Sequence, residues 1–226
     1  MGTLASNRKG YIQGASAANY GAALVVTTGT AYDSQTTSTT AIQYFKSTGR
    51  GGGTFRFIRT FIHFDTSGIS GGSSFQLQLT SAGGNSNSTN NVVAIKHSAG
   101  TGNGSELANS DFDNIDRSTV YSSSTAWASS GTVTISLNAA AATQITSNND
   151  FNIALLLFVD QEEQEEDPLE EDGDISNGIA FGSTIQLSYT DPASGYSNKI
   201  ASLAAASINK VSGLAVASVS KVNGVD

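Results

Sequence analysis

The chain has 226 residues, with 11 lysines and arginines against 19 aspartates and glutamates, a formal net charge of −8 and no cysteine. The lack of cysteine excludes disulfides, thiolate metal sites and cysteine nucleophiles, and two histidines are too few for a histidine-based metal site. The negative charge argues against a nucleic-acid partner, because binding to phosphates needs clustered lysine and arginine. We therefore expect a structural or binding protein, and no enzyme.

Residues 1–20 read as a polar N-terminal extension ahead of the folded body. They contain no apolar stretch of the length that a secretory signal needs. The longest apolar run of the chain, residues 153–159, is far shorter than a membrane-spanning helix. We expect a chain with no export signal and no membrane segment, kept in a cytoplasm or released by another route.

Short apolar runs follow, separated by clusters of glycine, serine, asparagine and threonine, a pattern typical of a β-sandwich or barrel. The expected strands are residues 22–28, 41–46, 54–64, 75–80, 91–97, 132–137, 151–159 and 178–189. Strand 75–80 alternates apolar and polar residues, which predicts one buried face. Strand 151–159 is apolar on both faces, which predicts a central strand. We predict one all-β domain over residues 21–192, a single antiparallel β-sandwich of the jelly-roll type.

The expected strand 54–64 changes its apolar face partway along. Phe55 and Phe57 lie on one face, whereas Ile62 and Phe64 lie on the other. This change of phase predicts a bulge or bend near Arg59.

Two short helical turns are expected between the strands. Asn138 precedes the run AAAATQIT, and asparagine is a good N-cap residue while alanine is the best helix former. This pattern predicts two turns that end near Asn148. Residues 110–115 predict a second short turn, capped by Ser110 or Asp111.

Residues 160–174 concentrate the acidity of the chain. Ten of these fifteen residues are acidic, and the rest of the chain carries nine acidic against eleven basic residues, about +2. Like charges at this density repel one another and favour an extended, solvated segment. We expect a surface loop. A cation site around Asp172 and Asp174 is the alternative, although the EF-hand spacing is absent.

The last part of the chain, residues 193–226, contains a tandem repeat. Residues 203–213 read LAAASINKVSG and residues 214–224 read LAVASVSKVNG, with seven identities. Two such units are too few to form a core of their own, so their apolar side chains must pack on the chain's own sandwich or on a neighbour. We expect an extended arm that docks into a partner or a second copy. Its apolar positions are Leu203, Ile208, Val211, Leu214, Val219 and Val222.

Three aspartates are the candidates for a calcium site. Asp111, Asp113 and Asp116 have a spacing that can gather oxygen atoms around Ca²⁺. The start of a helix is the favoured alternative, because carboxylates stabilise helix N-termini. No cofactor is assigned.

Other candidate residues also have a structural interpretation. Trp127 and Tyr121 are candidates for a sugar-stacking face, although a single tryptophan in a sandwich is usually core or rim. Arg59 and Asp65 flank an apolar strand, so they either pair with each other or cap the next turn. We expect His63 to face solvent or to lie satisfied on the sheet. No nucleophile–base pair is visible, so no catalytic residue is assigned.

The segment RTFIHFDTSGI, residues 59–69, resembles the strand and turn R-x-x-I-x-F-D-T-S-x-I of a family of β-sandwich modules of the DNRLRE type. That family occurs in bacterial surface and carbohydrate-binding proteins and in tailed phages. Residues 110–116, 121–127 and 133–138 resemble the order of elements in the phage members. The C-terminal Lys-Val-Ser/Asn-Gly units resemble the repeats of phage virion proteins. The resemblance covers residues 40–226 and carries over no ligand site.

The resemblance implies a non-enzymatic virion structural protein of a tailed phage. It would be a capsid-exterior decoration, cement or head-fibre subunit, or tail-associated, attached through its arm. The expected partners are other virion proteins and copies of itself, in a virion that assembles in the host cytoplasm. Two alternatives remain: a carbohydrate-binding or adhesion module for a host-surface glycan, and a self-assembling filament subunit.

Overall fold

The structure is a computed structural model, and it describes residues 1–34, 40–47, 53–84, 91–100, 107–128, 130–162, 175–191, 210–211 and 214–215. Its elements in chain order are β1 (Gly2–Ala5), β2 (Arg8–Gly14), α1 (Tyr20–Leu24), β3 (Gly29–Ser34), β4 (Thr40–Ser47), β5 (Thr54–Asp65), β6 (Ser73–Gly84), β7 (Asn91–His97), the 3₁₀ helix η1 (Asn109–Asp113), β8 (Ile115–Val120), β9 (Thr125–Ala126), β10 (Thr132–Ser136), α2 (Ala139–Ser147), β11 (Asp150–Leu157), α3 (Phe158–Gln161), β12 (Ile175–Thr190), β13 (Lys210–Val211) and β14 (Leu214–Ala215).

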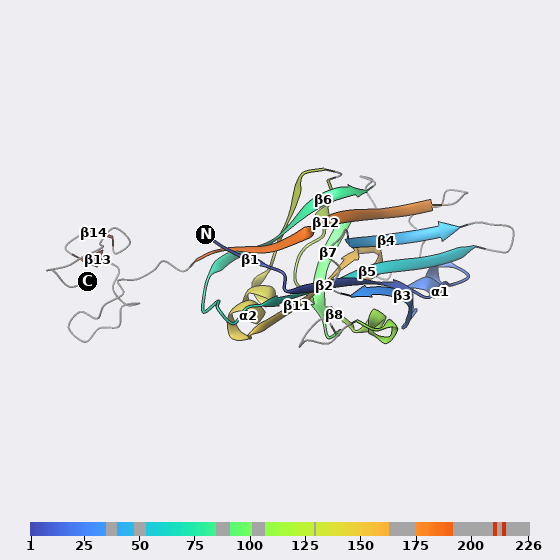
Figure 1. Cartoon of the computed structure of the whole chain (residues 1–226), viewed down its shortest axis with the longest axis horizontal. Coiled ribbons are helices and arrows are strands. Elements are labelled where there is room, and N and C mark those ends of the chain that lie inside the picture. The colour runs from blue at the N-terminus through green and yellow to red at the C-terminus, as the bar shows by residue number, and fades with distance from the viewer. Residues whose placement is uncertain are drawn as a thin grey trace.

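The strands form an all-β sandwich, as the sequence predicts, and the strand pairs in the described part of the chain are antiparallel. One layer has the order β10–β6–β12–β4, with β1 beside the second half of β12. The other has the order β5–β11–β7–β8, with β2 and then β3 along the remaining edge of β5. Figure 1 shows α1 at one end of the sandwich and α2 at the other. The jelly-roll type is a finer claim and stays a prediction.

β5 belongs to both layers. Its residues 54–58 pair with β4, and residues 60–65 pair with β11 along the same edge, while β2 pairs with residues 58–63 on the opposite edge. None of these pairings contains a register shift, so they show no bulge near Arg59, and the bend that was the alternative stays a prediction. The apolar face changes because β5 is buried on both faces, each against a different core.

The first core lies between the two layers. Phe75, Leu77 and Leu79 of β6 point into it, as their alternation with polar residues predicts. α2 adds Ala141 and Ile145 to this core. These contacts hold the layer of β6 and β12 against the layer of β5 and β11.

The second core covers the outer face of the β5–β11–β7 layer. Phe57 and Phe61 of β5 lie in it, beneath Tyr20 and Leu24 of α1 and Phe112 of η1. β11 carries apolar side chains on both faces because it lies between the two cores. Its predicted place as a central strand is therefore confirmed.

The N-terminal extension predicted for residues 1–20 is wrong. β1 pairs with β12 in one layer, and β2 pairs with β5 in the other. The chain crosses between the layers at two residues, where the Ser6 amide donates to the Ile185 carbonyl and the Asn7 amide to the His63 carbonyl, both at 3.0 Å. The N-terminal residues thus tie the two layers together.

The strand predicted at residues 22–28 is also wrong. Asn19 caps α1, and its side-chain oxygen accepts a hydrogen bond of 2.8 Å from the Ala22 amide. Val25, which lies inside the predicted strand, is exposed, and the next strand begins at Gly29. A good N-cap followed by alanines decides the local structure here.

The other predicted strands are present. Predicted strand 91–97 coincides with β7, and the remaining ones overlap β4, β5, β6, β10, β11 and β12, although residues 158 and 159 open α3. α2 follows Asn138, whose side chain accepts from the Ala141 amide at 3.1 Å, as predicted. The turn predicted at residues 110–115 is η1, one residue earlier. The strands β1, β2, β3, β8 and β9 lie outside the predicted ranges.

The C-terminal repeats are described only where they join. β13 and β14 form an antiparallel pair in which Val211 lies opposite Leu214, so the chain reverses direction at the junction of the two repeats. The other arm positions, Leu203, Ile208, Val219 and Val222, lie outside the described residues, as does most of the acidic segment. Among the helices that the structure describes, none is long and apolar enough to cross a membrane.

Candidate functional site

A buried ion pair joins Arg59 of β5 to Asp160 of α3. Both residues are 0% exposed. Nε and Nη2 of Arg59 each donate to one carboxylate oxygen of Asp160 at 2.8 Å, which is a bidentate pair. The third nitrogen, Nη1, donates to the Phe112 carbonyl at 2.8 Å, and the guanidinium lies 3.9 Å from the centroid of the Phe112 ring. The pair therefore holds η1 and α3 onto the outer face of β5.

A second arginine and a second aspartate complete this cluster. Nη2 of Arg117, on β8, lies 3.3 Å from Oδ1 of Asp160, and Nη1 of Arg117 lies 3.2 Å from Oδ1 of Asp113. The same Oδ1 of Asp113 lies 3.3 Å from Nη1 of Arg59. Two positive and two negative charges leave the cluster neutral overall. The balance matters most for Arg59 and Asp160, because an unpaired charge away from water costs several kcal/mol, whereas Arg117 and Asp113 are partly exposed. We define Arg59, Asp113, Arg117 and Asp160 as the buried charge cluster.

The buried charge cluster corrects one prediction and decides between two alternatives. Asp160 was assigned to the solvated acidic loop, but it lies fully buried in α3. Arg59 does not pair with Asp65, because Arg59 lies in the middle of β5 beneath η1, while Asp65 ends the strand. Asp65 caps the following turn, as the alternative interpretation predicted: it accepts from the Ser67 amide at 3.0 Å, and hydrogen bonds from Ser67 lower the pKa of Asp65.

The structure does not gather the three calcium candidates around one point. Asp111 accepts from the Ala108 amide at 2.9 Å and so closes the start of η1, which is the favoured alternative. Asp113 belongs to the buried charge cluster. Asp116 accepts from Ser118, and its hydrogen bonds, the largest of them from the Ser118 hydroxyl, lower the pKa of Asp116. In the described ranges, no group of three or more histidines or carboxylates has the arrangement of a metal site.

The aromatic pair considered for sugar stacking lies inside the sandwich. Trp127 is buried against Phe181, with ring centroids 6.0 Å apart, and Tyr121 is buried against Phe151 at 5.1 Å. Burial, followed by the charge of Asp116, raises the pKa of Tyr121 to about 12. Neither ring can stack on a ligand, so the structural alternative is correct for both.

His97 is neutral and structural. Its Nδ1 accepts from the Ala99 amide at 3.0 Å, so Nε2 carries the proton and donates to the Ile62 carbonyl at 3.1 Å. Burial lowers the pKa of His97 to about 4. The side chain therefore stabilises the chain reversal after β7 and takes no part in proton transfer near neutral pH.

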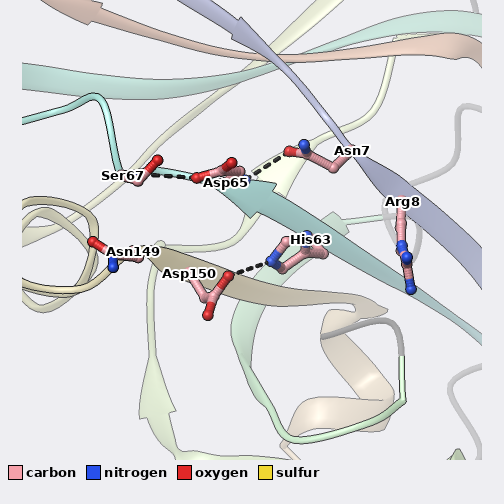
Figure 2. A pocket seen from close by; sticks show the side chains of 7 residues that line it. All are labelled: Asn7, Arg8, His63, Asp65, Ser67, Asn149 and Asp150. Atoms are coloured by element: carbon pink, nitrogen blue, oxygen red, sulfur yellow. Dashed lines mark hydrogen bonds and ion pairs between the residues drawn. The ribbon is translucent and has the colours of Figure 1, made fainter. Parts of the chain in front are cut away.

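A polar pocket of about 450 Å³ lies where β5 ends and β11 begins. Asp65 ends β5 and Asp150 starts β11, and these two residues pair across the strands. The crossing from β1 to β2 brings two N-terminal residues to the same place. We call this hollow the end pocket; its lining residues are Asn7, Arg8, His63, Asp65, Ser67, Asn149 and Asp150. Figure 2 shows them around the opening.

His63 lies at the centre of the end pocket. It is 8% exposed, and Figure 2 shows it between Asp150 and Arg8. Its Nε2 lies 2.8 Å from a carboxylate oxygen of Asp150. Arg8 lies opposite His63 on β2, and Asn152 lies opposite it on β11, so the three side chains form one row across the sheet. His63 thus lies on the sheet, as one of the two predicted alternatives has it, with its Nε2 paired to Asp150.

Sequence reasoning missed the end pocket as a site. The sequence points to His63 and Asp65 only as single residues, and Arg8, Asn149 and Asp150 are not among its candidates. The one available signal was the polar cluster at residues 148–150 directly ahead of a buried strand. The pairing of that cluster with the end of β5 depends on strand order, which the sequence does not specify.

No protein-family model matches the chain, and no curated protein is significantly similar to it.

Proposed function

We propose that the chain is a non-enzymatic structural protein of a tailed-phage virion. It acts as a capsid-exterior decoration, cement or head-fibre subunit, or lies on the tail. The sandwich is the rigid body, and residues 193–226 are the arm that attaches it to other virion proteins or to copies of itself.

The tandem repeat is the observation that carries this proposal. Its two units place valines at equivalent positions, Val211 and Val222, and the chain reverses direction between the units. Because the two units have the same apolar pattern, each offers equivalent side chains to a partner. Addition of strands to a neighbouring sheet gives affinity through main-chain hydrogen bonds, and alternate side chains give specificity.

The body supports the proposal through its rigidity. Two cores and the buried charge cluster pack both faces of the β5–β11–β7 layer. Among the described residues, the large hydrophobic side chains that are exposed are Met1 and Val25. The body therefore offers polar and hydroxyl-rich surface, and strong apolar attachment has to come from the arm.

The test compares arm variants for their incorporation into particles. Particles are assembled with the full chain, with a chain that lacks residues 193–226, and with the double variant Val211→Asp, Val222→Asp. The matched control is Lys210→Ala, Lys221→Ala, which changes the polar residues next to the same valines. We expect the deletion and the aspartate variant to lose attachment and the alanine control to retain it. Each variant is first checked by thermal unfolding, because an intact sandwich separates loss of attachment from loss of folding.

Electron microscopy of the purified protein tests the self-assembling alternative. Filaments formed by the protein alone would replace the decoration role with a filament subunit. Monomers or small oligomers that bind particles support the proposal.

A further inference from the structure

We propose that β10 is a contact between two copies of the chain, which join their sheets edge to edge across a two-fold axis at Thr134. β10 ends one side of the sheet, and among the described strands only β6 pairs with it. The contact lies on the sandwich, so the proposal does not depend on the arm or on the virion role.

The outer edge of β10 carries main-chain groups that β6 does not use. Two hydrogen bonds flank the pairing and fix its phase: the Leu137 amide donates to the Phe75 carbonyl at 2.9 Å, and the Ser81 amide donates to the Gly131 carbonyl at 2.8 Å. In an antiparallel pair, residues that bond to the partner strand alternate with residues whose amide and carbonyl groups point away. The residues of β10 that direct these groups to the free edge are therefore Thr132, Thr134 and Ser136, and all three are exposed.

β10 also lacks the features that usually keep a strand edge from pairing. Natural edge strands are protected by charged side chains, prolines, bulges or short length. β10 reads TVTIS, and its pairing with β6 contains no register shift.

The other edge strands that the structure describes are protected. β8 carries Asp116 and Arg117, and its pairing with β7 contains a register shift. β3 contains Asp33 and also pairs through a shift, while β1 and β9 have only four and two residues. Among the described edges, that of β10 is therefore the one open to a further strand.

A second copy of β10 matches this edge. When Thr134 lies opposite the partner's Thr134 in an antiparallel pair, Thr132 lies opposite the partner's Ser136. Each outward residue then exchanges both of its main-chain hydrogen bonds with the other copy. A shift to another antiparallel register moves one of the three past the end of the strand. The two-fold arrangement is thus the one that pairs every outward group of β10.

Charge favours a second copy at this edge, although the net charge of the whole chain is −8. Thr134, Gln78 of β6 and Gln186 of β12 lie in one row across three strands. The next row, with Ser136, Gln76 and Ser188, is uncharged as well. Two copies therefore meet through hydroxyl and amide groups without like charges opposite one another.

The contact is small, because β10 has five residues. It falls below the size of a standard protein interface, so we expect a dissociation constant of about 0.1–1 mM in solution. Copies that are held on one surface have a higher effective concentration, which strengthens such a contact.

The first test is sedimentation velocity of the full chain over a concentration series that spans this range. Thr134→Pro removes the outward amide hydrogen without breaking a bond to β6, and it should weaken the dimer at least about tenfold. Thr134→Ala is the matched control, because it shortens the side chain but keeps the main chain, and it should leave most of the association intact. Thermal unfolding of each variant verifies that the sandwich is folded.

The second test places the axis by cross-linking, since the chain has no cysteine of its own. The Cα atoms of Thr134 in the two copies should lie about 5.5 Å apart, whereas those of Thr132 should lie about 14 Å apart. A bifunctional thiol reagent with a reach below about 10 Å should therefore join Thr134→Cys and not Thr132→Cys. Thr80→Cys, on the exposed face of β6, controls for random collision.

Three results would overturn the proposal: a monomeric full chain up to about 1 mM, a dimer as strong in Thr134→Pro as in Thr134→Ala, or equal cross-linking of Thr132→Cys and Thr134→Cys. The arm variant Val211→Asp, Val222→Asp separates this contact from the arm. A dimer that persists in that variant supports pairing through β10, and a dimer lost in it belongs to the arm and contradicts the proposal. None of these results bears on attachment of the arm to particles.

Discussion

At the scale of single residues, the buried charge cluster is the arrangement on which the outer face of β5 depends. Arg59 makes four hydrogen bonds with no exposed surface, to Asp160, Asp113 and the Phe112 carbonyl. A buried ion pair contributes little net stability when it is intact, but removal of one partner leaves the other charge buried and unpaired. The main effect of the cluster on stability is therefore the free energy of unfolding that is lost when one of its residues is removed.

Asp160→Asn should lower the free energy of unfolding by about 3–5 kcal/mol, because Arg59 keeps its charge without its bidentate partner. Urea unfolding followed by tryptophan fluorescence measures the change. The double variant Arg59→Met, Asp160→Leu should recover much of the loss, since Asp113 and Arg117 remain as a neutral pair. Asp113→Asn is the control, with an expected loss below about 1 kcal/mol, because Asp113 is partly exposed. A loss for Asp160→Asn no larger than that of the control contradicts this account.

His97 makes the stability depend on pH in the acidic range. The pKa of His97 is about 4 in the folded chain and about 6.5 in the unfolded chain, so between these values the unfolded chain binds a proton that the folded chain does not. This contribution to stability is complete above pH 6.5 and is lost as the pH falls to 4, by on the order of 3 kcal/mol. His97→Gln should flatten that part of the profile. Equal slopes for the two proteins between pH 6.5 and 4 would show that His97 does not cause it.

At the scale of elements, alternation and capping were readable from the sequence, whereas strand partners were not. The alternation at Phe75, Leu77 and Leu79 and the capping asparagine Asn138 depend on neighbouring residues only, and both were predicted correctly. Asp160 was misplaced because its partner Arg59 lies 101 residues away. Burial of β5 on both faces produces the same change of apolar phase as a bulge or bend, because a second core on the outer face leaves no local signal.

The N-terminal segment gives the clearest test at this scale. Deletion of residues 1–6 removes β1 with its pairing to β12 and the packing of Leu4 on the first core. At about 1 kcal/mol for each net hydrogen bond, plus the packing of one leucine, the loss should reach several kcal/mol. Differential scanning calorimetry should show a lower midpoint for the deleted chain. An unchanged midpoint would mean that the segment is a dispensable extension.

At the scale of the whole molecule, the net charge of the chain does not describe the surface of its sandwich. The net charge of −8 comes from residues 160–174, and one of those carboxylates, Asp160, is neutralised inside the protein. The rest of the chain is close to neutral, so attachment by the body cannot depend on a strong field. In the virion role that we propose, the apolar repeats of the arm provide the attachment.

The most direct test of this account is the number of copies per purified particle, measured by quantitative mass spectrometry for the full chain and for the chain without residues 193–226. The account predicts many copies of the full chain, in a fixed ratio to the major capsid or tail protein, and none of the shortened chain, although its sandwich still unfolds cooperatively. Equal copy numbers for the two chains would contradict attachment through the arm, and the absence of the full chain from particles would contradict the virion role itself.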